Sequence, residues 1–358
     1  MLESLSAPPS QIILLTFLRC RFSIRPTMRT LSKIVLLGVV AAVCSYAQEP
    51  RNRGAQSAPP NATGQAQAGS ANSGDIHLMN VRGNVSMLVG AGGNVTVQAG
   101  DQGILLVDTG LTTMADKVLA TIRPLSGKPV LYIINTDDRP DHVGGNVPLG
   151  NGGRAGRGGG GAPNVNIIAF VTTQAWMSGP VGQPSPTPEA AWPNDTYSEP
   201  QRNLHFNGEA VQIFHQTGTT DGNSMVLFRG SDVVSTGDIF DPTQYPMIDL
   251  KEGGSLQGVL EGLNRLKEMV VPENHFEGGT MVIPGHGRLC DAADVAVYQQ
   301  MVTIVRDRLQ YMIKKGMTLE QVKAAKPTQD FDPIYGNNTG NWTTDMFVEA
   351  AYKSLGGK

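Results

Sequence analysis

Apolar and polar positions change their spacing several times along the chain, and each change predicts an element. From about Asp75, short apolar runs broken by glycines predict strands joined by hairpin-like turns. A helical spacing over 112–124 is followed by the apolar run 130–134, which predicts a helix and then a strand. Strands interleaved with helices in two comparable halves predict a layered α/β domain. The second half is expected to have strands at 167–171, 210–215, 224–228, 233–236 and 280–283, and helices at 256–269, at 292–315, after Thr318 and over 342–355.

Composition and pattern divide residues 48–358 into three parts. Residues 48–74 are rich in Gln, Ala, Gly, Pro and Ser with almost no large apolar residue, which predicts a disordered linker. The α/β domain is expected over 75–290, and a helical extension packed on it over 291–358. A second glycine-rich stretch, Gly150–Gly161, is expected to be a surface insertion within the domain.

Residues 1–47 have the pattern of an export signal that begins late. A basic stretch starts at Met28, the apolar run Ile34–Val43 follows, and small residues precede a cleavage point after Ala47. We expect translation to start at Met28 and the mature protein to be periplasmic or secreted, with no integral membrane segment after signal removal. The alternative is a cytosolic protein with an apolar N-terminal helix.

Net charge and cysteine content limit the kinds of partner and of catalytic residue that the chain can have. The formal net charge is −3, and residues 1–47 carry five basic residues and one acidic residue, which leaves −7 for the remainder. This balance speaks against nucleic acid as a partner and leaves a small-molecule substrate. Removal of the signal would also remove Cys20 and Cys44, so Cys290 would remain alone, either as a buried structural thiol or as a nucleophile.

Acidic and imidazole residues stand where expected strands end. They are Asp141 and His142 in NTDDRPDHVGGN, Asp238 in STGDIF and His286 in IPGHG. Strands that end at a common edge deliver such side chains to one place. Two imidazoles and two carboxylates form a suitable set of ligands for Zn²⁺, with Fe(II) or Mn²⁺ as alternatives.

The motifs resemble those of the metallo-β-lactamase superfamily from about Val81 to Arg288. Family members read VDTG, NTHxHxDHxGGN, AHTDGD, TGDLF and PGHG. This chain reads VDTG at 107–110, NTDDRPDHVGGN at 135–146, GTTDGN at 218–223, TGDIF at 236–240 and PGHG at 284–287. The resemblance implies a four-layer αβ/βα sandwich with metals at one edge between two sheets, and a hydrolase as the default activity.

The resemblance also implies that one half of the metal site is lost. The three histidines of the family's first site correspond to Asp137, Arg139 and Thr219, of which only Asp137 is a good ligand. A guanidinium has no lone pair to donate to a metal, and a threonine hydroxyl is a weak ligand. The second site is retained and corresponds to Asp141, His142, Asp238 and His286.

Other family positions imply supporting roles. Asp108 and Asp221 correspond to residues that orient ligands without binding metal, and we group Thr219 with them. A turn-capping role is the plain alternative for Asp108. His215 is expected to be a core or edge histidine, and the stretch Trp176–Trp192 either a lid or a plain connection.

Three interpretations of the site remain open. In the first, one Zn²⁺ rather than two activates water against an ester, lactone, thioester or amide bond, β-lactams included. Arg139 would then polarise a carbonyl or hold a carboxylate, and Asp137 or Asp138 would act as base or hold Arg139. In the second, the metal remains but the protein binds a ligand or partner without turnover. In the third, Arg139 neutralises the carboxylates and no metal binds.

Overall fold

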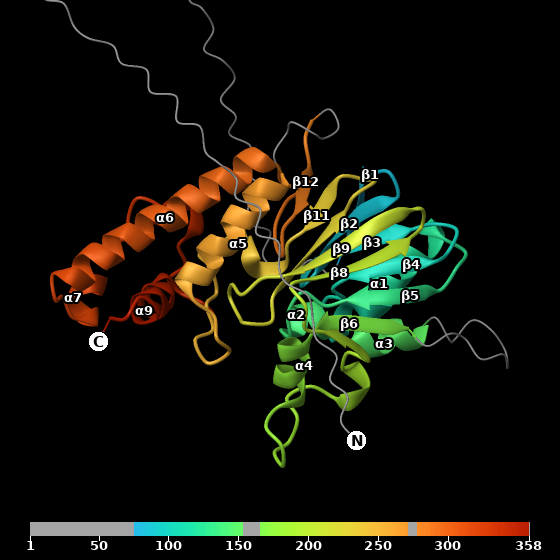
Figure 1. The fold of residues 1–358 in the computed structure, drawn as a ribbon, viewed down its shortest axis with the longest axis horizontal. Helices are drawn as coiled ribbons and strands as arrows, with labels where there is room; N and C mark the ends of the chain where they lie inside the picture. The colour runs from blue at the N-terminus through green and yellow to red at the C-terminus, as the bar shows by residue number, and fades with distance from the viewer. Residues whose placement is uncertain (1–74, 153–164, 271–277, 358) are drawn as a thin grey trace, which may run out of the picture. The chain divides into compact units, whose positions relative to one another are not determined.

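Two β-sheets organise the part of the chain that the computed structural model describes, residues 75–152, 165–270 and 278–357 (Figure 1). These residues fall in one compact unit. The expected export signal (1–47), the linker (48–74) and most of the insertion Gly150–Gly161 lie outside the described residues. No helix in the described ranges is both long and apolar enough to cross a bilayer.

The first sheet has seven strands in sequence order, so each strand pairs with its neighbour along the chain. The first four strands pair antiparallel, and the pairs from the fourth strand onward are parallel. The strands are β1 (His77–Arg82), β2 (Val85–Ala91), β3 (Gly93–Ala99), β4 (Ile104–Val107), β5 (Val130–Ile134), β6 (Asn166–Phe170) and β7 (Asp195–Tyr197).

The second sheet has five strands in the order β12-β11-β10-β9-β8. Its pairs are antiparallel except for β11 and β12, which run parallel. The strands are β8 (Gln201–Phe206), β9 (Glu209–His215), β10 (Ser224–Phe228), β11 (Val233–Ser235) and β12 (Met281–Ile283).

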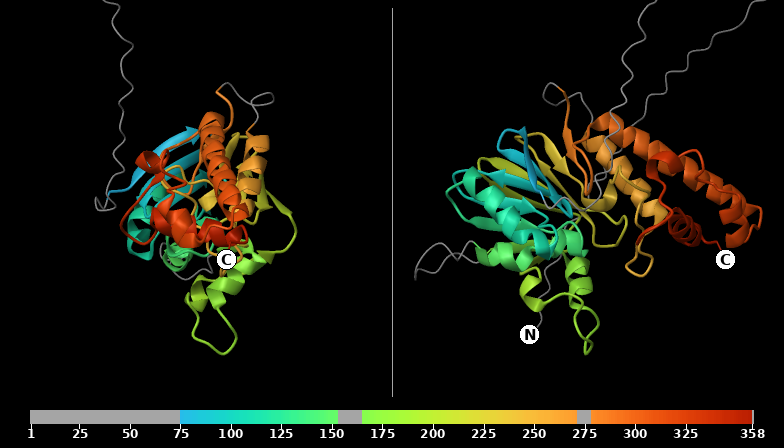
Figure 2. Two further views of the ribbon diagram at one scale, coloured as in Figure 1. Left: turned by 90° about the vertical axis from the view of Figure 1, so that its left-hand side faces the viewer. Right: turned by 180° about the vertical axis from the view of Figure 1, so that it is seen from behind.

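The two sheets and the helices on their outer faces form four layers (Figure 2). Three hydrophobic clusters lie between these layers. Between the sheets, Val107 and Ile134 of the first sheet share a cluster with Val226 and Phe228 of the second. Helices α1 (Ala115–Ile122) and α3 (Asn146–Gly152) cover the outer face of the first sheet. Helix α5 (Leu256–Met269) and the C-terminal helices cover the outer face of the second. The expected αβ/βα sandwich is therefore confirmed.

The C-terminal helices share one hydrophobic core with α5. Tyr298 of α6, Phe347 of α9 and Leu263 of α5 all lie in it and are buried. This core gives the apolar residues after Arg288 the burial that their helical spacing required. The helices are α6 (Ala292–Lys314), α7 (Leu319–Ala324), α8 (Asp332–Tyr335) and α9 (Thr344–Ser354).

Some elements differ from the sequence prediction. The segment 112–124 is a 3₁₀ turn, α1 and a second 3₁₀ turn that contains Pro124, rather than one helix. Strands β7 and β8 were not predicted, because QRNLHF at 201–206 has few apolar residues. Helix α4 (Val171–Ser178) was not predicted either, because its β-branched start favours a strand.

Two parallel strand pairs place the expected site residues at one edge. β4 pairs with β5 in the first sheet, and β11 pairs with β12 in the second. The carboxyl ends of parallel strands meet at the same edge of a sheet. The segments that begin with Asp108, Asn135, Thr236 and Pro284 therefore start at neighbouring strand ends.

Burial makes Cys290 an unreactive thiol. Its side chain is 3% exposed, and its Sγ donates to the Arg288 carbonyl at 3.3 Å. Burial, with the charge of Asp294, raises the pKa of Cys290 to about 12. In a Cys20→Ser/Cys44→Ser chain, we expect Ellman's reagent to label the native protein at least about a hundredfold more slowly than the denatured one, because the thiolate is the reacting form. Fast stoichiometric labelling of the native protein would instead support a nucleophilic thiol.

Candidate metal centre

The four residues of the expected second site lie together. His286 Nε2 is 3.0 Å from Asp141 Oδ2 and 3.6 Å from Asp238 Oδ1. His142 Nε2 is 3.4 Å from the same Asp238 oxygen. Asp141 and His142 belong to the short helix α2 (Pro140–Val143), whereas Asp238 and His286 follow β11 and β12. Four side chains from three segments therefore meet, and both histidines face Asp238 Oδ1.

Asp108 fixes the ring of His142. His142 Nδ1 donates to Asp108 Oδ2 at 2.8 Å, and the hydroxyl and backbone N–H of Thr136 donate to the same carboxylate at 2.6 and 2.8 Å. An ionised carboxylate can only accept, so the proton of the neutral imidazole lies on Nδ1. Nε2 is then left with a lone pair, as in carboxylate–histidine–metal arrangements. The role expected of Asp108 agrees with this contact.

The arrangement fits a metal ion. His142 Nε2 and Asp238 Oδ1 are both buried and have no hydrogen-bond partner among the described residues. Such orphaned atoms are rare in native proteins and call for a missing partner. Tetrahedral zinc with bonds of about 2.0–2.1 Å holds its ligand atoms roughly 3.3 Å apart, close to the separations above. Asp141, His142 and His286 also form a group with the spacing of metal ligands.

Two glycines make room for this group. A Cβ on Gly285 would lie 2.2 Å from Asp238 Oδ1, and one on Gly237 would lie 2.4 Å from Thr136 Oγ1. Gly237 also has a φ of +50°, which favours glycine. The glycines of TGD and PGH thus let the backbone pass directly beside the ligand side chains.

Arg139, which stands where the family motif has a histidine, contacts two carboxylates and a backbone carbonyl. Its Nη1 donates to Asp238 Oδ2 at 2.6 Å and to Asp137 Oδ2 at 3.1 Å, and its Nη2 donates to the Met247 carbonyl at 2.7 Å. Its backbone N–H donates to Asp137 Oδ1 at 2.8 Å. Of the two candidates to hold Arg139, Asp137 therefore makes the contact. The two oxygens of Asp238 are divided, one facing the guanidinium and the other the histidines.

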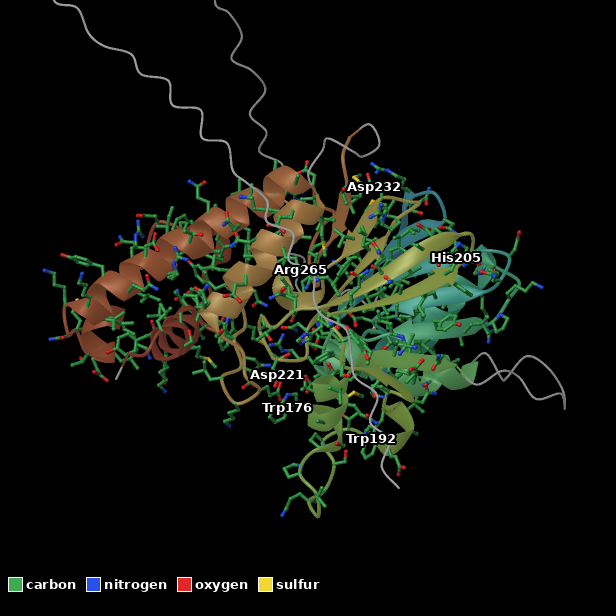
Figure 3. All side chains as sticks on the ribbon, in the orientation of Figure 1. Trp176, Trp192, His205, Asp221, Asp232 and Arg265 are labelled. Carbon is green, nitrogen blue, oxygen red and sulfur yellow. The ribbon has the colours of Figure 1, made fainter. Side chains whose placement is uncertain are left out.

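Thr219 and Asp221 face other partners than the candidate ligands. The Thr219 hydroxyl donates to Asn223 Oδ1 at 3.0 Å, and Asn223 in turn donates to Asp137 Oδ2 at 3.4 Å. The Asp221 carboxylate accepts from the indole of Trp176 on α4 at 2.8 Å (Figure 3). Thr219 thus supports Asp137 indirectly, and Asp221 ties α4 to the loop after β9.

His215 has an edge position. Its ring stacks on Phe170 with centroids 3.5 Å apart, and its Nε2 donates to the Asp221 carbonyl at 2.8 Å. Burial lowers its pKa. These contacts support the expected core or edge role.

Buried carboxylates concentrate negative charge in the site, and this charge shifts the pKa values of its two histidines. Burial opposes the charged form of His142, but the carboxylates of Asp137, Asp108, Asp238 and Asp141 outweigh it and raise the pKa of His142 well above its ordinary value. Burial also opposes the charged form of His286, but its hydrogen bond with Asp141 and the charges of Asp238 and Asp241 raise its pKa to about 9. Protons therefore compensate the carboxylates when no other cation does, and a metal must displace them.

The pKa values of Asp141 and Asp138 shift in opposite directions. Burial alone would raise the pKa of Asp141, but His142 and a hydrogen bond from His286 lower it to about 2. Burial and the charges of Asp137 and Glu252 raise the pKa of Asp138 to about 7. Asp141 is thus a permanent carboxylate, whereas Asp138 sits among like charges.

Sequence reasoning missed Asp241 and the Met247 carbonyl. Asp241 forms a group of metal-ligand spacing with Asp238 and His286, and its carboxylate accepts from Thr243 and Gln244. Its position just after TGDIF was the available signal for it. A backbone carbonyl such as that of Met247 leaves no such signal in a sequence.

Comparisons with known proteins concern the family and the fold. The family model described as "Metallo-beta-lactamase superfamily" matches residues 88–287. The chain is similar to a sec-alkylsulfatase from Pseudomonas sp., with a TM-score of 0.54 and 15% identity, covering 78% of this chain and 50% of that one. It thus spans about half the length of that enzyme. A metallo-beta-lactamase from Pontibacter korlensis gives a TM-score of 0.49 and 15% identity over 64% of this chain and 99% of its own. No curated protein matches significantly.

The family match covers more than half of the chain and contains all the candidate ligands. The expected resemblance is confirmed, and the chain belongs to the metallo-β-lactamase superfamily.

Proposed function

We propose that this protein is an exported metal-dependent hydrolase with a mononuclear site, acting on an ester, lactone, thioester or amide bond of a small molecule. The observation that carries the proposal is the pair of orphaned atoms, His142 Nε2 and Asp238 Oδ1, beside Asp141 and His286. Membership of a superfamily with many hydrolases supports the reaction class. Zn²⁺ suits the two imidazoles and two carboxylates best, with Fe or Mn as alternatives.

Each residue has a separate task in this proposal. Asp141, His142, Asp238 and His286 would hold the ion, and Asp108 orients His142. A divalent metal held there supplies Lewis acidity and activates water as the nucleophile.

Arg139 acts on the other side of Asp238. It holds Asp238 Oδ2 and is itself held by Asp137. Its described bonds use three of the five guanidinium N–H donors, so two are left to polarise a substrate carbonyl or to hold a carboxylate.

A second candidate is a non-catalytic binding protein on the same scaffold. The observation in its favour is that Arg139 pairs with both Asp137 and Asp238 and so compensates part of their charge. The same contacts would suit a metal-free ion-pair cluster. Metal content separates these candidates most directly.

We expect about one equivalent of a transition metal in the purified protein by elemental mass spectrometry. Asp141→Ala should lose it, because it removes a ligand and the partner of His286. Asp195→Ala is the matched control, since this carboxylate pairs with Arg202 outside the centre. Two equivalents would mean that Arg139 does not close the first half-site. No metal, even after reconstitution, would favour the ion-pair cluster.

Arg139→Gln should destabilise the metal-free protein by about 3 kcal/mol, because it leaves two buried carboxylates without their cation. Arg202→Gln removes a more exposed pair and should cost less than about 1 kcal/mol. Urea unfolding of both variants measures the difference. Equal costs would show that Arg139 has no special role in neutralising the site.

Restoring the lost histidines tests Arg139 further. The triple change Asp137→His, Arg139→His and Thr219→His should raise metal stoichiometry from one toward two, because it rebuilds the family's ligand set. Hydrolysis of the native substrate should fall if Arg139 polarises it. Increased hydrolysis would reject that role and mark the protein as a degraded two-metal enzyme.

Export predicts a defined N-terminus. When the protein is expressed in a bacterial host, it should be recovered outside the cytoplasm. Its measured mass should be that of a chain that starts at Gln48, because cleavage is expected after Ala47. Leu36→Arg/Leu37→Arg should block export, since it interrupts the apolar run. Uncut wild-type protein in the cytoplasm would contradict export.

A further inference from the structure

We propose that the C-terminal helices position the metal centre through residues 241–248, which we call the bridging segment. Asp241, Met247 and their neighbours in this segment lie between β11 and α5, outside any helix or strand. It has no ladder or helix of its own, so its conformation depends on side-chain bonds within it, such as those that Asp241 accepts from Thr243 and Gln244, and on contacts made by other elements. The inference rests on the proposed function only where metal affinity is measured.

On one side, the bridging segment contacts the metal centre. The Met247 carbonyl accepts from Arg139 Nη2 at 2.7 Å, and Arg139 Nη1 donates to Asp238 Oδ2 at 2.6 Å. A Cβ on Gly287, beside His286, would lie 2.6 Å from Thr243 Cγ2. A displacement of the segment would therefore reach both Asp238 and the His286 loop.

On the other side, the C-terminal helices hold two successive carbonyls of the segment. The Tyr298 hydroxyl of α6 donates to the Gln244 carbonyl at 2.9 Å. The Trp342 indole donates to the Tyr245 carbonyl at 3.2 Å. Both donors come from residues beyond the family match, which ends at residue 287.

The side chain of Tyr245 is anchored in the same helices. Its ring stacks on Phe347 of α9, with centroids 4.6 Å apart and planes 1° apart. Its hydroxyl donates to Asp332 Oδ1 of α8 at 2.8 Å and lies 3.2 Å from the Thr328 carbonyl. Tyr245 is buried. Two residues later in the chain, the Met247 carbonyl holds Arg139, so the anchor and the site contact are close along the backbone.

Tyr298 and Trp342 are positioning residues in this scheme. They touch neither a candidate ligand nor a place for substrate in the described contacts, and they act through the backbone of the bridging segment. Partners that orient ligands in this indirect way typically change metal affinity by 10–100-fold when mutated. Loss of the hydroxyl in Tyr298→Phe should leave the packing of that aromatic ring intact.

The test compares Tyr298→Phe and Trp342→Phe with Tyr352→Phe in the full chain. For Tyr298→Phe the control makes the same chemical change in the same helical region, because the Tyr352 hydroxyl donates to the Met317 carbonyl at 2.8 Å. The first measurement is amide hydrogen exchange of the metal-free proteins. Both test variants should exchange faster over residues 241–248 and over 137–143, and the control should match wild type at both.

The second measurement is Zn²⁺ affinity by competition with a chelating dye. We expect Kd to rise about tenfold in each test variant and to stay unchanged in Tyr352→Phe. Unchanged exchange over 137–143 would overturn the inference, as would a Kd equal to that of the control. If wild type binds no Zn²⁺, the zinc form of the proposed function fails, and hydrogen exchange alone still decides whether the helices position Arg139.

Discussion

The ion pair between Arg139 and Asp238 is the contact on which the rest of the site depends. Carboxylates of Asp137, Asp238 and Asp241 are buried close together, and buried charges of one sign are costly unless cations compensate them. Arg139 supplies one fixed positive charge, shared at 2.6 Å with Asp238 and 3.1 Å with Asp137. The remaining oxygen of Asp238 stays directed at His142 and His286, where a proton or a metal must complete the balance.

Arg139 stands where the family motif has a histidine, and a guanidinium differs from a metal ion in what it can do there. It is permanently charged and binds through hydrogen bonds of fixed direction. Its one positive charge is therefore present beside Asp137 and Asp238 whether or not a metal is bound. Its third acceptor is the Met247 carbonyl, so a backbone segment contributes to the support of the site.

Strand ends account for what the sequence could predict. Asp108, Asp238 and His286 each follow an apolar strand, and parallel pairing brings those ends together, so both the layered fold and the second half-site followed from pattern and motif. The remainder depends on tertiary contacts. Asp221 fits the family motif, yet its carboxylate contacts Trp176. Trp176 lies on α4, a helix that was not predicted because its β-branched residues favour a strand. The role of Met247 rests on a carbonyl, which every residue has.

The position of the C-terminal helices bears on how Arg139 is held. In a two-metal site, ligand bonds to both ions would fix the surrounding loops. Here the guanidinium of Arg139 makes three hydrogen bonds, which are weaker than metal–ligand bonds, so the loop that accepts from it must be held by something else. Tyr298, Trp342 and Phe347 hold that loop, and all three lie beyond the matched family residues. A buried arginine is held precisely only if its acceptors are fixed, and in this chain the elements that fix the Met247 loop are the C-terminal helices.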